Sequence, residues 1–194
     1  MSSESNDPLV LPVLPGTAVS LRAFELDDVD AVLEASRDAL IPLITSIPVG
    51  ASPEQAEAFI ERQHGRLRER SGYSFAIADH QGAAVGQIGL WLRDEAHCRA
   101  SIGYWVRQSA RGNGYAGHAL NVLVGWARTL PQLNRFELYV EPRNEASWRT
   151  AEAVGFEREG VMRAWQVVDG TPRDMYMYAL VVGSPREQGG AASA

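Results

Sequence analysis

The chain has 194 residues, of which 45% are hydrophobic, and its formal net charge at pH 7 is −6. This length and apolar content predict one globular domain with a proper core. The negative charge argues against general nucleic-acid binding, because phosphate contacts need a clustered positive surface.

Lysine and cysteine usage excludes further classes of protein. All 18 basic residues are arginine, which excludes a Walker-type P-loop and lysine Schiff-base chemistry. Cys98 is the single cysteine, so no intrachain disulfide can form. No apolar run reaches the ~18 residues of a membrane span, and the first residues lack the basic and apolar regions of a signal peptide. We therefore expect a cytoplasmic protein without membrane contact.

The chain begins with a predicted tail, a strand and a helix. Residues 1–14, rich in Ser and Pro, and residues 184–194 are expected to be flexible tails around one domain over residues 15–183. Thr17 to Phe24 predicts the first strand. A helix start, where the helix dipole favours negative charge, is then indicated by Asp27, Asp28 and Asp30.

A second helix is predicted to begin at Pro53, with Ser52 as its N-cap. Leu40 to Pro48 joins the two helices as an apolar loop. Three strand-like runs then follow one another without a helix between them: Tyr73 to Asp79, Ala83 to Arg93 and Arg99 to Arg107. Short connections predict antiparallel pairing, because parallel strands need a long crossover.

A glycine-rich stretch, Arg111 to Gly117, separates the third of these runs from the strongest helix signal in the chain. The apolar residues of that helix share one face: Ala116, Leu120, Leu123, Val124, Ala127 and Leu130. Glycines let a ligand approach the backbone, and the first N–H groups of a helix lack intrahelical partners. The stretch therefore predicts a cradle for the diphosphate of a cofactor.

The last third of the chain predicts a strand, a short helix and a hairpin. Arg135 to Glu141 alternates as a strand, and a short helix follows over residues 144–154. Two strand-like runs, Phe156 to Val168 and Arg173 to Val182, are joined by the hairpin signal Asp169-Gly170. The predicted order β-α-α-β-β-β-α-β-α-β-β indicates an α+β fold in three layers.

A dinucleotide-binding fold is one alternative interpretation of the glycine stretch. Gly112, Gly114 and Gly117 satisfy the G-x-G-x-x-G spacing, and acidic residues follow at a tolerable distance. A Rossmann fold alternates strands with helices, however, whereas the three central runs here are consecutive. This alternative is therefore disfavoured.

The stretch Arg111-Gly112-Asn113-Gly114-Tyr115-Ala116 fits the R/Q-x-x-G-x-G/A signature of the GNAT superfamily of acyl-CoA-dependent N-acyltransferases. Other motifs resemble its ribosomal-protein N-terminal (RimJ/RimL-type) acetyltransferase branch: Leu21-Arg22-Ala23-Phe24, Ile102-Gly103-Tyr104-Trp105-Val106, Asn144-Glu145-Ala146-Ser147 and Gly155-Phe156. The resemblance covers residues 17–182. It implies a mixed, mostly antiparallel central sheet whose fourth and fifth strands splay apart.

The resemblance also implies where an acyl-CoA would bind. The diphosphate is expected on the backbone amides of Arg111, Gly112, Asn113, Gly114, Tyr115 and Ala116. The backbone of Val106 would pair with the pantetheine arm, and its N–H would be the oxyanion donor. Asn144 is the expected cofactor contact, and Ser147 would hold or protonate the leaving thiolate. The structural alternative is a helix cap at Asn144 and a first-turn residue at Ser147.

The general base is not specified by the resemblance. Where related enzymes carry a catalytic Glu and an acid Tyr, this chain has Tyr139 and Ala151, and Ser101 replaces a frequent Glu. The remaining candidate bases are Glu137, Glu141 and His97, of which we select Glu141; all three also suit a solvated strand edge or loop. The lack of an obvious base favours an α-amine, whose pKa of about 8 is below the ~10.4 of a lysine amine.

Two segments are expected to contact the acceptor, because they border the acceptor site in this superfamily. Between the first two helices the candidates are Ile41, Pro42, Leu43, Ile44 and Ile47, for which core packing is an equal alternative. On the final hairpin they are Arg163, Asp174, Tyr176 and Tyr178, for which exposed strand positions without a role in the site are the default alternative. The final strands commonly mediate dimers in the family, so a homodimer is a further expectation.

The histidines show no metal-ligand spacing, and no G-x-S-x-G nucleophile elbow is present. We therefore expect an enzyme that uses no metal. From the family resemblance we expect a bacterial-type acetyltransferase that transfers acetyl from acetyl-CoA, or another acyl group, to a primary amine such as a protein N-terminus. Direct attack is expected, because Cys98 lies away from the expected thioester. The alternative is a regulatory module that binds acyl-CoA with little catalysis.

Overall fold

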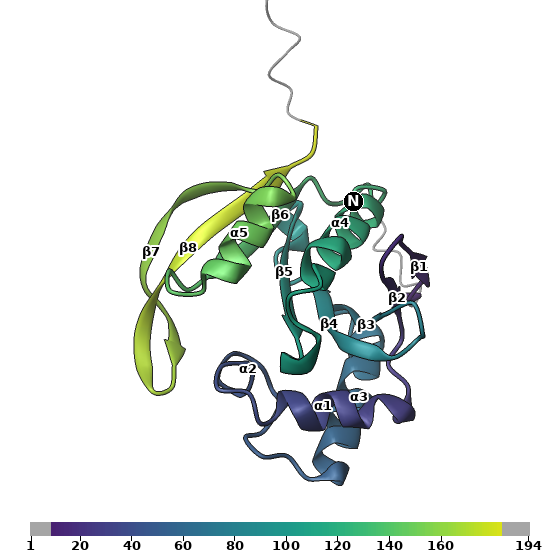
Figure 1. Cartoon of the computed structure of the whole chain (residues 1–194). Coiled ribbons are helices and arrows are strands. Elements are labelled where there is room, and N and C mark those ends of the chain that lie inside the picture. Colours follow the sequence, from purple (N-terminus) through teal and green to yellow (C-terminus); the bar gives the residue numbers. More distant parts are fainter. Residues whose placement is uncertain (1–8, 184–194) are drawn as a thin grey trace, which may run out of the picture.

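The computed structural model describes residues 9–183. Eight strands form one sheet in the order β1-β2-β3-β4-β5-β6-β8-β7 (Figure 1). Neighbouring strands are antiparallel except for β5 and β6, which are parallel. The predicted α+β class and mostly antiparallel sheet are confirmed. Residues 1–8, the outer part of the predicted N-terminal tail, and residues 184–194, the whole predicted C-terminal tail, lie outside the described residues.

The sheet begins with two short strands, β1 (Leu14–Pro15) and β2 (Ser20–Arg22). The strand expected over residues 17–24 is therefore shorter than predicted, and β1 was not predicted. The folded part of the chain also extends N-terminal of residue 15. Apolar side chains of this segment pack against the core, which outweighs its Pro-rich composition: Leu9, Leu11 and Leu14.

Three helices follow β2: α1 (Val29–Ala35), α2 (Ile41–Ile44) and α3 (Pro53–Arg68). The start of α3 is as predicted, since the Ser52 hydroxyl accepts from the Gln55 amide at 3.3 Å. The single turn α2 lies in the segment that was expected to be a loop. The carboxylate of Asp38 accepts from the first amides of this turn, Leu40 at 2.8 Å and Ile41 at 3.0 Å.

The acidic residues before α1 do more than favour the helix dipole. Asp28 is buried and ends a 3-10 turn over Leu26–Asp28. Its two carboxylate oxygens accept from the Arg22 guanidinium at 2.7 and 2.8 Å. This ion pair joins the end of β2 to the start of α1.

Strands β3 (Gly72–Ala78), β4 (Ala84–Trp91) and β5 (Arg99–Val106) form a continuous antiparallel meander. The sequence-based expectation of direct strand-to-strand connections is confirmed. A doubly wound Rossmann sheet is contradicted, because such a sheet requires a helix between successive parallel strands.

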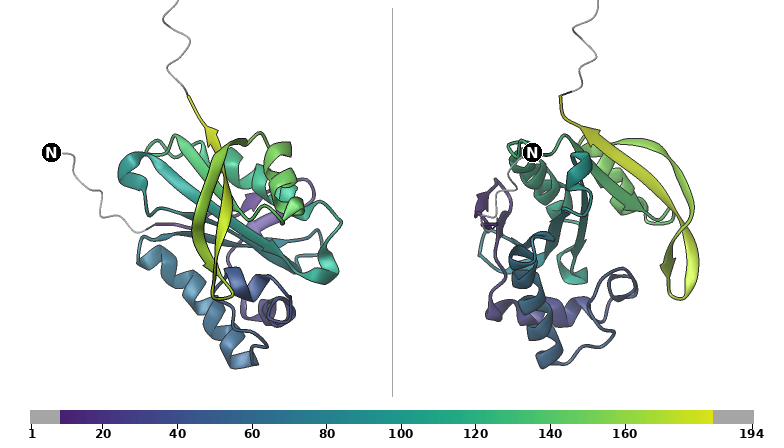
Figure 2. Two further views of the ribbon diagram at one scale, coloured as in Figure 1. Left: turned by 90° about the vertical axis from the view of Figure 1, so that its left-hand side faces the viewer. Right: turned by 180° about the vertical axis from the view of Figure 1, so that it is seen from behind.

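Helices cover both faces of the sheet (Figure 2). α4 (Tyr115–Ala127) and α5 (Glu145–Ala153) lie on one face, and α1 and α3 lie on the other. Successive side chains of β3 alternate between the two cores: Phe75 faces α4, and Ala76 faces α3. This burial on both faces fixes the register of the central strands.

The chain ends with β6 (Arg135–Val140), β7 (Glu157–Val168) and β8 (Thr171–Val181). The predicted hairpin turn is confirmed, since Asp169 and Gly170 both have positive φ, at 49° and 67°. The β7–β8 hairpin projects from the body of the molecule (Figure 1).

The parallel pair β5 and β6 separates after three residues. Pairing begins at Arg99 with Arg135 and ends at Ser101 with Glu137. Within residues 9–183 no further pairing joins the two strands. The splay that the family resemblance implies is therefore present, and it leaves one edge of β5 free towards β6.

Candidate active site

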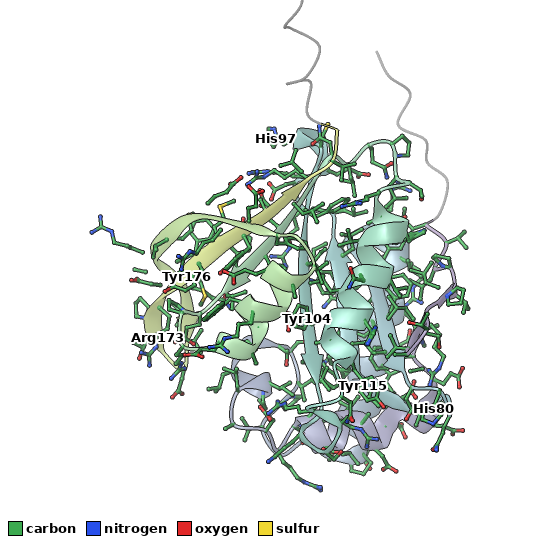
Figure 3. The ribbon with its side chains drawn as sticks, turned by 45° about the horizontal axis from the view of Figure 1, so that its top comes forward. His80, His97, Tyr104, Tyr115, Arg173 and Tyr176 are labelled. Carbon is green, nitrogen blue, oxygen red and sulfur yellow. The ribbon has the colours of Figure 1, made fainter. Side chains whose placement is uncertain are left out.

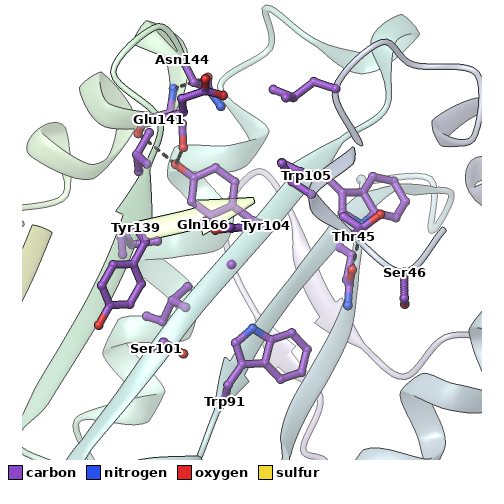
Figure 4. Close-up of a pocket in the computed structure, with 18 of the residues that line it drawn as sticks. Thr45, Ser46, Trp91, Ser101, Tyr104, Trp105, Tyr139, Glu141, Asn144 and Gln166 are labelled. Atoms are coloured by element: carbon purple, nitrogen blue, oxygen red, sulfur yellow. Dashed lines mark hydrogen bonds between the residues drawn. The ribbon is translucent and has the colours of Figure 1, made fainter. Parts of the chain in front are cut away.

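Two cavities meet where β5 and β6 part. The loop-side pocket, of about 370 Å³, lies between the glycine-rich stretch and α5. The strand-side pocket, of about 510 Å³, lies among β4, β5, β6, α2 and α3 (Figure 4). The two pockets share six lining residues: Leu40, Ile44, Tyr104, Trp105, Asn144 and Ser147. A ligand that extends from one pocket into the other must therefore pass these residues.

The glycine-rich stretch carries a row of free backbone donors. The Arg111 N–H donates to the Gln108 carbonyl at 3.2 Å, so it is paired. The next N–H groups, from Gly112 to Gly117, have no acceptor within residues 9–183. Gly112 and Gly114 have φ of 83° and 72°, a conformation in which most side chains are strained. The donor row was expected to begin at Arg111, and it begins one residue later.

Most of the expected cofactor contacts line the loop-side pocket: Val106, Arg111, Gly112, Gly114, Tyr115, Ala116, Asn144 and Ser147. Asn113 does not line it. The Asn113 side-chain amide instead donates to the Ala110 carbonyl at 3.1 Å, a hydrogen bond within the loop itself. Other lining residues were not among the expected cofactor contacts, and they include Ala110, Gly117, Ala146 and Thr150.

The backbone of Val106 faces the gap between β5 and β6. Arg107 donates its N–H to the Val85 carbonyl on β4 at 2.9 Å. Because backbone groups of an antiparallel pair alternate in direction, the N–H and C=O of Val106 point away from β4. The Val106 carbonyl accepts from Arg111 Nε at 3.1 Å, whereas its N–H is available to a ligand.

Ser147 and Asn144 lie together at the junction of the two pockets. Asn144 caps α5, with its Oδ1 accepting from the Ser147 amide at 3.3 Å. Asn144 is therefore a helix cap and Ser147 a first-turn residue, as the structural alternative predicts. Both residues nevertheless also line both pockets. The Tyr104 hydroxyl lies 3.0 Å from both the carbonyl oxygen and Oγ of Ser147.

Tyr104 is a site residue that the sequence reasoning did not select. Burial raises the pKa of Tyr104, although its hydrogen bonds with Ser147 and Thr150 act in the opposite direction. The phenol therefore stays protonated at neutral pH and can donate to Ser147. Its position in the motif Ile102-Gly103-Tyr104 was the available signal, but only the fold brings it against α5.

Two ion pairs tie the glycine-rich stretch to the first helices. Arg111 Nη2 lies 2.7 Å from Asp38, the residue that caps α2. Glu34 of α1 accepts from the Ser109 N–H at 2.7 Å and from Arg107 at 3.2 Å. Burial alone would raise the pKa of Glu34, but the Ser109 hydrogen bonds and the Arg107 charge lower it on balance. These contacts join the loop to α1 and to Asp38, which precedes α2.

Of the three candidate bases, only Glu141 lines a pocket. It lies at the end of β6 in the strand-side pocket, with Oε1 2.8 Å from Arg143 Nε. Its Oε2 is buried and has no hydrogen-bond partner in the described part of the chain. One carboxylate oxygen is thus free to accept a proton.

Glu137 and His97 lie outside both pockets. Glu137 is not a solvated edge residue, because it is 1% exposed and accepts from Arg135 at 2.6 Å and from the Tyr139 hydroxyl at 2.8 Å. Burial, with this hydrogen bond and the Glu137 charge, raises the pKa of Tyr139 to about 12. His97 lies at the edge of the molecule, well apart from Tyr104 (Figure 3).

The expected acceptor contacts between α1 and α3 are only partly in place. Ile44 lines both pockets, and Ile41 lines the loop-side pocket. Three others line neither pocket: Pro42, Leu43 and Ile47. Ile47 is buried in the core, as the packing alternative predicts. The strand-side pocket uses neighbouring residues instead: Leu40, Thr45 and Ser46.

The expected hairpin contacts line neither pocket: Arg163, Asp174, Tyr176 and Tyr178. Tyr176 and Tyr178 face the core on the α5 side, and the Tyr178 hydroxyl donates to Glu152 at 2.8 Å. Met175, on the opposite face, reaches the strand-side pocket together with Gln166. Gln166 follows a break in the β7 register after Met162, which changes the face that each side chain occupies.

No metal site is evident in residues 9–183, because no group of three His, Cys, Asp or Glu side chains could hold an ion there. Cys98 is exposed and lines neither pocket. Among residues 9–183, no helix combines the length and the apolar character needed to cross a membrane.

A sheet split at its parallel pair, with free amides at the split, places this chain in the class of N-acetyltransferases. The family model for the acetyltransferase (GNAT) domain matches residues 19–157. The chain belongs to the GNAT acetyltransferase family, which confirms the resemblance stated from its motifs.

Known relatives agree with this assignment. The uncharacterised N-acetyltransferase p20 of Bacillus licheniformis is 28% identical over 164 residues, 84% of this chain and 92% of that protein. The ribosomal-protein-serine acetyltransferase of Escherichia coli (strain K12) is 29% identical over 118 residues, 61% of this chain and 66% of that protein. The structure of Mycobacterium smegmatis RimJ in complex with CoA-disulfide is 27% identical, with a TM-score of 0.77 over 88% of this chain and 87% of that chain.

Proposed function

We propose that this protein transfers the acetyl group of acetyl-CoA to a primary amine, such as a protein N-terminal α-amine, by direct attack. The observation that carries the proposal is the row of free amides from Gly112 to Gly117 beside the free edge of β5. Coenzyme A complexes among similar structures, and ribosomal-protein acetyltransferases among the relatives, support it.

The loop-side pocket offers backbone donors and side chains that would suit a coenzyme A. The amides of Gly112, Gly114 and Tyr115 would bind the diphosphate, where the N-terminus of α4 adds partial positive charge. The backbone of Val106 would pair with the pantetheine amides, as a strand would. Asn144 would contact the thiol end of the arm from α5.

When bound, acetyl-CoA supplies the thioester: the amine nitrogen bonds to the carbonyl carbon, the carbon–sulfur bond breaks, nitrogen loses a proton and the thiolate gains one. The Val106 N–H would donate to the carbonyl oxygen as negative charge develops there. Ser147 Oγ would hydrogen-bond to the sulfur while the thiolate takes up the proton that the amine has released, and the Tyr104 hydroxyl would hold Ser147 in position.

Glu141 is the proposed base, because it is the one candidate that lines the pocket that would hold the amine, and its Oε2 has no hydrogen-bond partner within residues 9–183. An α-amine with a pKa of about 8 needs little help, whereas an amine with a pKa of about 10.4 needs a strong base. A covalent enzyme intermediate is not part of the proposal, since the single cysteine, Cys98, lies outside both pockets.

The cytoplasmic location and the homodimer that the sequence suggests stay predictions. Neither is needed for the reaction, because every group named above comes from one chain. A dimer would be tested by light scattering over a range of protein concentrations.

Calorimetric titration with coenzyme A, followed by a thiol-release assay with acetyl-CoA and a panel of amines and peptides, tests the proposed function. We expect saturable binding and acceptor-dependent release of thiol, with the acetyl group found on the amine by mass spectrometry. Binding without release for every acceptor would favour the regulatory alternative. Absence of binding would reject both.

A further inference from the structure

The strand-side pocket contains two arginines that lack an acidic partner. Arg66 comes from α3, and Arg93 follows β4; both line the pocket. Within residues 9–183 neither forms an ion pair with a carboxylate. Other arginines around the site are paired, as Arg107 is with Glu34 and Arg111 is with Asp38. Uncompensated positive charge is therefore concentrated in one part of the pocket.

Neutral groups hold Arg66 in place. Its Nε donates to the Gln63 side-chain oxygen at 3.0 Å, and its guanidinium carbon lies 4.2 Å from the centre of the Trp91 ring. These contacts orient the side chain without cancelling its charge. The terminal nitrogens of Arg66 make no hydrogen bond within the described residues, so they remain available to a ligand.

The Trp91 ring, which contacts Arg66, packs over two glycines. A Cβ on Gly89 would come within 2.4 Å of the Trp91 ring, and a Cβ on Gly103 would lie 3.5 Å from its Nε1. The ring therefore lies over β4 and β5 where both strands lack side chains. A larger residue at Gly89 would displace the ring and, with it, the Arg66 guanidinium.

The surroundings of Arg66 disfavour its positive charge. Burial lowers the pKa of Arg66, and the neighbouring charges of Arg93 and Arg62 lower it further, while Glu69 acts in the opposite direction. Proximity of Arg66 to Arg93 is thus unfavourable in the free protein. An anion between the two guanidinium groups would relieve this repulsion.

The opposite end of the same pocket contains the Glu141 carboxylate, whose Oε1 pairs with Arg143 and Arg173 and whose Oε2 has no partner within residues 9–183. Glu141 and Asn144 lie across the pocket from Trp91 (Figure 4). Trp91 pairs with Ser101, three residues before Tyr104 on β5, which corresponds to roughly 10 Å of strand. An acceptor that reaches from Tyr104 to Arg66 therefore needs a positive amine at one end and a negative group within about 10 Å of it.

We propose that the acceptor is a primary amine that also carries a carboxylate or phosphate, which Arg66 and Arg93 bind while the amine lies near Glu141 and Tyr104. This inference rests on the proposed acetyl transfer and narrows its substrate class. The net charge of −6 on the whole chain would suit a basic acceptor. The positive charges of Arg66 and Arg93 in the pocket instead favour an amine that also carries an anionic group.

Matched pairs of amines that differ only in the anionic group test the inference. The probes are β-alanine with β-alaninamide, alanyl-glutamate amide with alanyl-glutamine amide, and phosphoethanolamine with ethanolamine. We expect the anionic member of at least one pair to have about tenfold higher kcat/KM in thiol release. The carboxylate and phosphate pairs separate the two sources of the anion.

Arginine variants connect the preference to the pocket. Arg93→Gln and Arg66→Gln are each expected to raise KM for the preferred anionic amine about tenfold and to change its kcat little. The kcat/KM for the neutral amine of the same pair should also change little. Arg66→Lys, which keeps the charge, should retain part of the preference. Arg68→Gln is the matched control, because Arg68 is on the same helix, is 68% exposed and lines neither pocket.

Equal kcat/KM within all three pairs would overturn the inference and leave the proposed acetyl transfer standing. So would an anion preference that survives in both glutamine variants. If no probe is turned over, calorimetry on the coenzyme A-saturated protein decides: equal affinity, or equal lack of binding, within every pair rejects the inference. Failure of coenzyme A itself to bind would reject the proposed function instead.

Discussion

The two pockets of the site are built in opposite ways. The loop-side pocket takes most of its polar groups from the backbone of one short stretch, Val106 to Gly117. The strand-side pocket takes side chains from helices, from five strands and from the loops around them, over residues 40–175. The first can therefore bind a chemical group common to a whole family, whereas the second can change its ligand by single substitutions.

This difference separates what is general in the protein from what is particular to it. Backbone amides bind a diphosphate irrespective of the side chains between the glycines. Arg66, Trp91 and Glu141, in contrast, specify charge and shape at separate points of the strand-side pocket. The predictions below test this division, beginning with the largest expected effect.

Gly112→Asp should weaken coenzyme A binding about 100-fold, because a carboxylate would face the diphosphate. Gly82→Asp is the matched control. The two glycines have similar φ, 83° and 85°, and a Cβ on either meets no atom within 4 Å. Both variants should lose a similar free energy of unfolding, about 1 kcal/mol, and only the first should lose affinity in calorimetry. Unchanged affinity in Gly112→Asp would place the diphosphate elsewhere.

Ser147→Ala should lower kcat roughly 10- to 100-fold and leave coenzyme A affinity nearly unchanged, because Oγ acts on the leaving sulfur. Tyr104→Phe should have a similar effect, since its hydroxyl lies 3.0 Å from that oxygen. The double variant should be no slower than the slower single variant, as expected for two groups that act as a unit. A wild-type kcat in Ser147→Ala would reduce Ser147 to a first-turn residue of α5.

Glu141→Gln should reduce kcat/KM about tenfold for an amine with a pKa near 10 and less for one with a pKa near 8. The reason is that the more basic amine depends more strongly on a proton acceptor. Glu145→Gln, on an exposed residue of α5 that lines neither pocket, is the control. Equal losses for both amines would mean that Glu141 positions the acceptor rather than accepting its proton.

Asp38→Asn should lower the free energy of unfolding at pH 7 by about 1–2 kcal/mol, because the ion pair with Arg111 is lost. Burial alone would raise the pKa of Asp38, but the Leu40 and Ile41 amides and Arg111 lower it on balance. A carboxyl with a lowered pKa stabilises the folded state above its unfolded pKa, about 3.9, and loses this effect as the pH falls through the folded pKa.

The difference in stability between wild type and Asp38→Asn should therefore be constant at neutral pH and shrink below about pH 4 in denaturant titrations. Asp30→Asn, an exposed residue of α1, should show no such dependence. A difference that persists to pH 2 would show that the substitution acts through packing. Such a result would mean that the Arg111–Asp38 ion pair does not stabilise the contact between the loop and α2.

Particular residues show how far the sequence could lead. Arg111 and Asn113 belong to the signature, yet the Arg111 amide is paired and Asn113 faces away from the pocket. A local signature predicts a turn but not which of its groups are already satisfied. Gln166 was missed because a break in the β7 register changes the face it occupies, and an alternating pattern cannot reveal such a break.

The acceptor side was the least predictable part of the site. Arg66 and Trp91 are 25 residues apart and come together where the ring lies over Gly89 and Gly103; a Cβ on Gly89 would collide with the ring. The charge in the pocket has the opposite sign from the charge of the whole chain. Net charge is a sum over the molecule, whereas recognition depends on the few groups that remain unpaired within reach of a ligand.

The amino-acid sequence alone determined the family, the antiparallel meander, the hairpin turn and the stretch of amides that would bind coenzyme A. These depend on periodicity, turn residues and contiguous backbone, all of which are local. Only the tertiary structure decided that Tyr104 meets Ser147, that Glu137 is buried among arginines, and that Arg66 and Arg93 line the strand-side pocket. Such contacts join distant segments, and their energies depend on burial and on which partners are already bound.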